Sequence, residues 1–126
     1  MISVLDTTAF SAAMRYDESM MSHLRSRSPG SVATVEPVVA EVEYGVQQLP
    51  EGSRRRQLLE NEKQRLLEVI RVLEWLPEAE LEHNGTPVDD FEVLIAALAC
   101  SHGAEVITAN LAPFLLILGV SARHWG

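Results

Sequence analysis

With 126 residues, 47% of them apolar, the chain is long enough for one domain with a single hydrophobic core. Its 18 acidic and 10 basic side chains leave a net charge of −8, which disfavours broad, sequence-independent binding to nucleic acid and leaves room for a local basic patch or an acidic metal site. No apolar run reaches the roughly 18 residues of a membrane span, no secretory signal pattern is present, and the lone Cys100 excludes an intrachain disulfide, so we expect a cytoplasmic protein.

The first predicted element is a short buried strand over residues 2–5, which ends at a carboxylate, Asp6. From Thr7 to about Arg27, the apolar residues have helical spacing over several separate stretches. Asp6 is a candidate functional residue, because sites in open α/β sheets form beyond the carboxyl ends of the strands. The alternative is that Asp6 only caps the helix that follows it.

A second strand is predicted over residues 32–35, followed by a helix with Pro37 at its first position, where the missing N–H breaks no hydrogen bond. Two acids of this helix, Glu41 and Glu43, both flank its apolar stripe, so periodicity alone does not choose between them.

The next segment, residues 54–70, is rich in strong helix formers and predicts a helix. Residues 71–77 either extend that helix or form another strand, and residues 82–87 predict a loop.

Towards the C-terminus, residues 89–103 predict a buried helix with acids at its start, among them Asp90 and Glu92. Acids there suit the helix dipole, and they also suit a metal site. A strand is predicted over residues 105–108, beside the strand that ends at Asp6, and Asn110 follows it. The pattern of residues 115–126, apolar and then polar, predicts no definite element.

Short strands that alternate with helices are typical of an α/β protein with a mainly parallel sheet. Acids that converge on one rim of such a sheet repel one another unless a cation neutralises them. Hard divalent ions such as Mg²⁺ and Mn²⁺ prefer these oxygen ligands. The sequence therefore predicts a divalent-metal site at that rim.

Five segments, taken in order, resemble the PIN-domain ribonucleases of the VapC toxin type over nearly the whole chain. They are "VLDTTAF" (4–10), "VVAEVEYG" (38–45), "GTPVDDFEVLIAALA" (85–99), "VITANLAPF" (106–114) and "RHW" (123–125). The resemblance implies a single PIN-like domain over residues 1–126, with a three-layer α/β/α fold around a mainly parallel sheet. It also implies Mg²⁺- or Mn²⁺-dependent hydrolysis of RNA phosphodiesters, a homodimer, and a VapB-like antitoxin.

Position by position, the resemblance implies that Asp6, Glu41 and Glu92 are catalytic metal ligands, and it selects Glu41 over Glu43. Asp90 is implied as a supporting acid. Thr108 and Asn110 match a polar "T-x-N" element that orients a metal-bound water or a ligand carboxylate. The implied antitoxin lies across the groove near the acids, and a basic partner fits the acidic net charge.

Three features depart from the family pattern. Glu92 stands where relatives usually carry Asp, the chain is shortened between about residues 76 and 85, and Pro113 replaces a frequent acid or polar residue. The longer Glu92 side chain moves its carboxylate, and Mg²⁺ demands near-ideal octahedral geometry. Glu92 and the shortened segment motivate an alternative, a catalytically weak or inactive PIN-fold module that binds an antitoxin or RNA. We expect the apolar residues 115–118 to form dimer or core surface.

Overall fold

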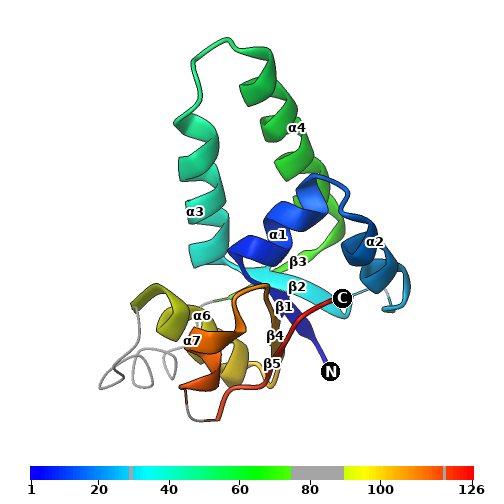
Figure 1. Ribbon diagram of the computed structural model, residues 1–126, viewed down its shortest axis with the longest axis vertical. Helices are drawn as coiled ribbons and strands as arrows, with labels where there is room; N and C mark the ends of the chain where they lie inside the picture. Colours follow the sequence, from blue (N-terminus) through cyan, green and yellow to red (C-terminus); the bar gives the residue numbers. More distant parts are fainter. Residues whose placement is uncertain (29, 75–89, 118) are drawn as a thin grey trace.

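The computed structural model describes residues 1–28, 30–74, 90–117 and 119–126 (Figure 1). Its strands are β1 (Ser3–Leu5), β2 (Val32–Val35), β3 (Arg71–Leu73), β4 (Glu105–Ile107) and β5 (Ala122–Arg123). They form one sheet in the order β3-β2-β1-β4-β5, and every neighbouring pair is parallel. The predicted parallel sheet is confirmed.

Helices cover both faces of this sheet. They are α1 (Thr7–Met14), α2 (Glu18–Arg25), α3 (Glu36–Gln47), α4 (Arg54–Val69), α6 (Asp90–Ser101) and α7 (Leu111–Leu115). The chain moves outward from β1 through β2 to β3, then returns to β4 and continues to β5. Because crossovers between parallel strands are right-handed, the first set of connections places α1 to α4 on one face, and the second places α6 and α7 on the other. Figure 1 shows the resulting three-layer α/β/α fold, which was predicted.

The centre of the sheet is fully buried. Every residue of β1, β2 and β4 is buried, since helices pack on both faces. The largest fully buried side chains include Phe10 of α1 and Phe114 of α7, one from each helical layer. Leu5 pairs with Ile107, so β1 and β4 end side by side at the same rim. This register brings Asp6 and the residues after β4 together.

The junction of α1 and α2 is sharply turned. Tyr16 has a φ of 58°, a left-handed conformation that residues other than glycine adopt rarely. Hydrogen bonds from Tyr16 N to Ala13 O (3.2 Å) and from Asp17 N to Ala12 O (3.0 Å) close the end of α1. The guanidinium of Arg65 on α4 lies 4.6 Å from the centre of the Tyr16 ring and so ties this turn to α4.

Most predicted elements are confirmed with small shifts of their bounds. The helical stretch after Thr7 is broken into α1 and α2, and the helix predicted from Pro37 begins one residue earlier, at Glu36. Of the two alternatives for residues 71–77, the strand is correct for Arg71–Leu73. The loop at 82–87 and the shortening near 76–85 lie outside the described residues.

The C-terminal part contains structure that the sequence did not predict. α7 and the two-residue strand β5 lie there, and β5 extends the sheet beside β4. Leu115 and Leu116 are 71% and 69% exposed, so the prediction that residues 115–118 form core surface is wrong for these two residues. Leu118 lies outside the described residues. The lone Cys100 is only partly buried. Among the described residues, no helix combines the length and apolarity needed to cross a membrane.

The burial of Phe10 between α1 and the sheet predicts a large stability contribution. Phe10→Ala should lower the free energy of unfolding by about 3–5 kcal/mol, because it leaves a cavity in the core. Leu58→Ala on α4 is the control, since that side chain is 56% exposed, and its effect should stay within about 0.5 kcal/mol. Urea unfolding measures both, and similar losses would contradict this assignment of the core.

Candidate functional site

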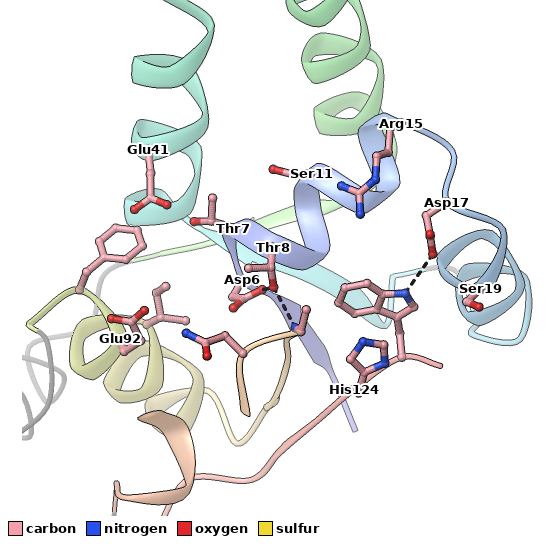
Figure 2. Close-up of a pocket in the computed structure, with 15 residues that line it drawn as sticks. Asp6, Thr7, Thr8, Ser11, Arg15, Asp17, Ser19, Glu41, Glu92 and His124 are labelled. Carbon is pink, nitrogen blue, oxygen red and sulfur yellow. Dashed lines mark hydrogen bonds between the residues drawn. The ribbon is translucent and has the colours of Figure 1, made fainter. Parts of the chain in front are cut away.

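A pocket of about 880 Å³ lies at the carboxyl ends of β1 and β4. Asp6, which directly follows β1, lines it together with Ala109 and Asn110, which follow β4. Glu41 of α3 and Glu92 of α6 also line it. Figure 2 shows Glu41 and Glu92 on one side of this pocket, with Asp6 nearer its middle. The pocket is where α/β sheets characteristically bind ligands.

Asp6 both caps a helix and faces this pocket. Its Oδ1 accepts hydrogen bonds from Ala9 N (2.9 Å), which caps α1, and from Thr8 Oγ1 (2.6 Å). The residue is only 5% exposed. Within the described part of the chain, Oδ2 accepts no hydrogen bond, so one oxygen serves the fold and the other is left for a ligand.

A chain of hydroxyl groups fixes the Asp6 carboxylate. Thr8 gives its single proton to Asp6 and accepts from Ala109 N at 2.9 Å. Thr108 Oγ1 lies 3.5 Å from Thr8 Oγ1 and accepts from Asn110 N at 2.8 Å. Since the Thr8 proton is already used, Thr108 is the donor of this long contact. The backbone after β4 therefore orients Asp6 through two threonines.

Sequence reasoning missed Thr8 at this site. Thr108, which it did predict, is fully buried behind Thr8, whereas Asn110 lines the pocket. The available signal was a hydroxyl residue two positions after the strand-ending Asp6, at the start of a helix.

The structure separates Glu41 and Glu43, two acids of α3. Glu41 lines the pocket, whereas Glu43 pairs with Lys63 of α4 and accepts from Gln47 Nε2 at 2.8 Å. Only Glu41 therefore shares a pocket with Asp6 and Glu92. The Asp90 side chain lies outside the described part of the structure.

The donor set suits a divalent cation bound partly through water. Among the described residues, no three carboxylate, histidine or cysteine side chains lie close enough to share one ion. Mg²⁺ commonly keeps several waters and binds directly to only one or two carboxylates, so a close triad is not required. Thr7 Oγ1, beside the acids, is buried without a hydrogen-bond partner in the described residues. This orphaned hydroxyl and Asp6 Oδ2 both fit a polar ligand.

The other side of the pocket carries aromatic and basic groups that the sequence did not single out for a role. Trp125 Nε1 donates to Asp17 Oδ2 at 3.1 Å, and the His124 ring stacks on Trp125 with centroids 4.2 Å apart and planes at 19°. The Met20 N–H and then the Trp125 N–H lower the pKa of Asp17. Arg15, at the end of α1, lines the same side.

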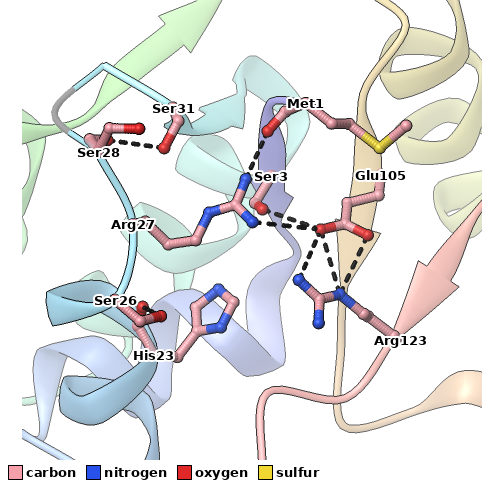
Figure 3. Close-up of polar contacts among 9 residues, drawn as sticks. All are labelled: Met1, Ser3, His23, Ser26, Arg27, Ser28, Ser31, Glu105 and Arg123. Carbon is pink, nitrogen blue, oxygen red and sulfur yellow. Dashed lines mark hydrogen bonds and ion pairs between the residues drawn. The ribbon is translucent and has the colours of Figure 1, made fainter.

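A second polar cluster lies at the amino ends of β1 and β4 (Figure 3). Arg123 Nε lies 3.2 and 3.1 Å from the two carboxylate oxygens of Glu105, and Ser3 Oγ donates to Oε1 at 3.2 Å. Burial raises the pKa of Glu105, but Arg123, Ser3 and Arg27 outweigh that effect and leave the pKa below its usual value. Burial, followed by the charges of Arg123 and Arg27, lowers the pKa of His23. The cluster therefore joins β1, β4 and β5 away from the pocket, and Arg27, which follows α2, pairs with Glu105.

The profile of the PIN domain family matches residues 3–114, so this chain belongs to the PIN domain family. No curated protein sequence matches it significantly.

Solved structures of VapBC and FitAcB proteins contain the same fold. VapBC2 from Rickettsia felis, bound to a promoter DNA fragment, aligns with a TM-score of 0.84 at 19% identity over 100% of both chains. FitAcB from Neisseria gonorrhoeae aligns at 0.83 and 23% identity over 98% of both chains. DNA-bound VapBC from Salmonella typhimurium aligns at 0.81 and 22% identity over 100% of this chain and 99% of that chain.

Because Asp6 both caps α1 and lines the pocket, its substitution by Ala and by Asn should change the free energy of unfolding differently. Asp6→Ala should lower the free energy of unfolding by about 0.5–2 kcal/mol, because the helix cap is lost. Asp6→Asn should not lower it in EDTA, because the amide oxygen still caps and one of the repelling charges is removed. Thermal or urea unfolding compares the two, and an equal loss in both variants would contradict the cap.

The Glu105 cluster predicts a pH dependence of stability. A lowered folded-state pKa stabilises the fold above the usual carboxyl pKa of 4.5, and this contribution is lost as pH falls through the folded value. The native chain should therefore have a higher free energy of unfolding than Glu105→Gln. This difference should be largest above pH 4.5 and should decrease as the pH falls below that value. Glu51→Gln, at an exposed residue, is the matched control. A gap that stays constant with pH would contradict the assignment.

Proposed function

We propose that this chain is a divalent-metal-dependent endoribonuclease of the VapC type, the toxin of a toxin–antitoxin pair. The observation that carries the proposal is the meeting of Asp6, Glu41 and Glu92, from three separate elements, in one pocket. Membership of the PIN family and the fold shared with solved VapBC complexes support it. The proposed reaction is hydrolysis of an RNA phosphodiester.

In this proposal Asp6 Oδ2, Glu41 and Glu92 hold Mg²⁺ or Mn²⁺, with Asp90 as a supporting acid. The ion supplies activation of water and neutralisation of phosphate charge. Thr8 keeps Asp6 oriented through Oδ1, and Thr108 supports Thr8 from behind. Asn110, which also lines the pocket, orients the substrate or its attacking water.

We further propose that a VapB-like antitoxin covers this pocket with a basic segment. The net charge of −8 and the carboxylates of the pocket favour such a partner electrostatically. A groove of about 510 Å³ between α1, α3 and α4 adjoins the pocket, and Glu41 lines both. Tyr44, 68% exposed, lies at this groove and offers apolar surface.

A homodimer is the proposed assembly. Leu115 and Leu116 are exposed apolar neighbours at the end of α7, and a second copy of the chain would remove them from water.

Two observations favour the alternative of a catalytically weak PIN-fold module. Among the described residues, no three candidate ligands lie close enough to share one ion, and Glu92 is the longer acid at its position. Such a module keeps the partner surface and loses hydrolysis.

Cleavage of single-stranded RNA with Mn²⁺, with Mg²⁺ and with EDTA tests the proposed activity. Asp6→Asn and Glu41→Gln should each reduce metal-dependent cleavage by about 100-fold or more, because each removes a ligand charge. Glu43→Gln is the matched control, since its carboxylate pairs with Lys63 outside the pocket, and it should stay close to the native rate.

Cleavage that continues in EDTA, or that survives in Asp6→Asn, would contradict the proposal. Folded native protein that cleaves nothing with either ion would establish the inactive module. In that case, cleavage by Glu92→Asp shows whether the longer Glu92 side chain causes the inactivity, because restored cleavage would assign the defect to this residue.

A further inference from the structure

The pocket contains a stacking platform, formed by His124 and Trp125, on the side away from Glu41 and Glu92. The two rings are 4.2 Å apart between centroids and 19° from parallel. Trp125 is half-buried and His124 is exposed, and both line the pocket. His124 is the more exposed ring of this stacked pair, so a planar ligand entering the pocket would meet an aromatic ring backed by a second one.

The stacking platform is held in place by the fold. Asp17 Oδ2 accepts from both Trp125 Nε1 (3.1 Å) and Met20 N (3.0 Å), so the same oxygen anchors the indole and caps α2. His124 Nδ1 accepts from Gly126 N at 2.8 Å, which leaves Nε2 as the protonated nitrogen. A ligand would not need to order these side chains, and preorganised groups bind at lower entropic cost.

Charge also differs between the two sides of the pocket. Figure 2 shows Arg15, Asp17 and His124 on one side and Glu41 and Glu92 on the other. Within the described residues, Arg15 forms no ion pair, and its guanidinium acts on Asp17 only through a longer-range attraction. A cation at the acids and a guanidinium beside the platform would together suit a chain of phosphates.

We propose that the stacking platform binds an unpaired nucleobase of the RNA next to the phosphate held at the acids, and that Arg15 contacts the adjoining phosphate. The inference rests on the proposed ribonuclease function for the identity of the ligand. Aromatic side chains bind the π-faces of bases that are free of a duplex, so the ligand class is single-stranded RNA. The stacking platform thus determines how the RNA strand is positioned relative to the acids of the pocket.

Binding of a fluorescent single-stranded oligoribonucleotide tests the proposal without cleavage. All variants carry Asp6→Asn, which keeps the RNA intact, and anisotropy gives the dissociation constant. His124→Ala should weaken binding about fivefold or more, as loss of one stacked base does. His124→Tyr, which restores an aromatic plane, should recover most of that binding, and Arg15→Gln should weaken binding and reduce its salt dependence.

The matched control is His102→Ala. His102 lies just after α6, its Nε2 contacts Glu74 O at 2.9 Å, and it does not line the pocket. This variant should bind RNA as the parent does. Equal losses in the two alanine variants, equal affinity of His124→Ala and its parent, or equal affinity for duplex and single-stranded RNA would overturn the proposal.

Tryptophan emission gives an independent readout. The chain has two tryptophans, so Trp75→Phe leaves Trp125 as the only one. Saturating RNA should change its emission, and no change despite binding would overturn the platform. Binding of a basic peptide but not of RNA would also overturn it.

The two proposals fail separately. RNA cleavage that depends on Asp6 and Glu41 but not on His124 would support the nuclease and overturn the platform. RNA binding that depends on His124, without cleavage under any condition, would support the platform in an inactive module.

Discussion

The hydrogen bonding of a single carboxylate, Asp6, connects the fold to the site. Asp6 stands where the central strand β1 ends, and its Oδ1 caps α1 while it accepts from Thr8. These two contacts set the direction of α1 and hold the Asp6 carboxylate at the pocket that Glu41 and Glu92 also line. The parallel pairing of β1 with β4 then brings Asn110 to the same rim. The observed cap and the proposed ligand role use different oxygens of one carboxylate, so they are compatible.

Electrostatics explains why the pocket has two different sides. Carboxylates around a shared pocket repel one another and repel RNA, so the acidic side needs a cation or a basic partner before it can accept a phosphate. In the proposed function, the metal ion and the antitoxin compete for that same negative charge. Arg15 and the stacking platform of His124 and Trp125 lie on the side of the pocket away from Glu41 and Glu92, and they offer the RNA strand contacts that are independent of the ion.

The sequence predicted what depends on local pattern and on strand order. Short apolar segments predicted β1, β2 and β4. The resemblance of residues 38–45 to the family pattern selected Glu41 over Glu43, and in the structure Glu41 lines the pocket whereas Glu43 pairs with Lys63. Elements without a local signal were missed: β5 has two residues and exists through its pairing with β4. The Trp125–Asp17 hydrogen bond joins residues 108 positions apart, and only the folded sheet brings them together. No periodicity predicts such a contact.

The most direct measurement of the central claim is the anomalous diffraction of Mn²⁺ in crystals of the native chain. We expect a manganese peak in the pocket, at coordination distance from Asp6 Oδ2, with Glu41 and Glu92 bound to the ion directly or through water. The peak should vanish in Asp6→Asn crystals. A pocket without a peak at saturating Mn²⁺, or an ion bound only elsewhere on the chain, would contradict the assignment of these carboxylates as a metal site.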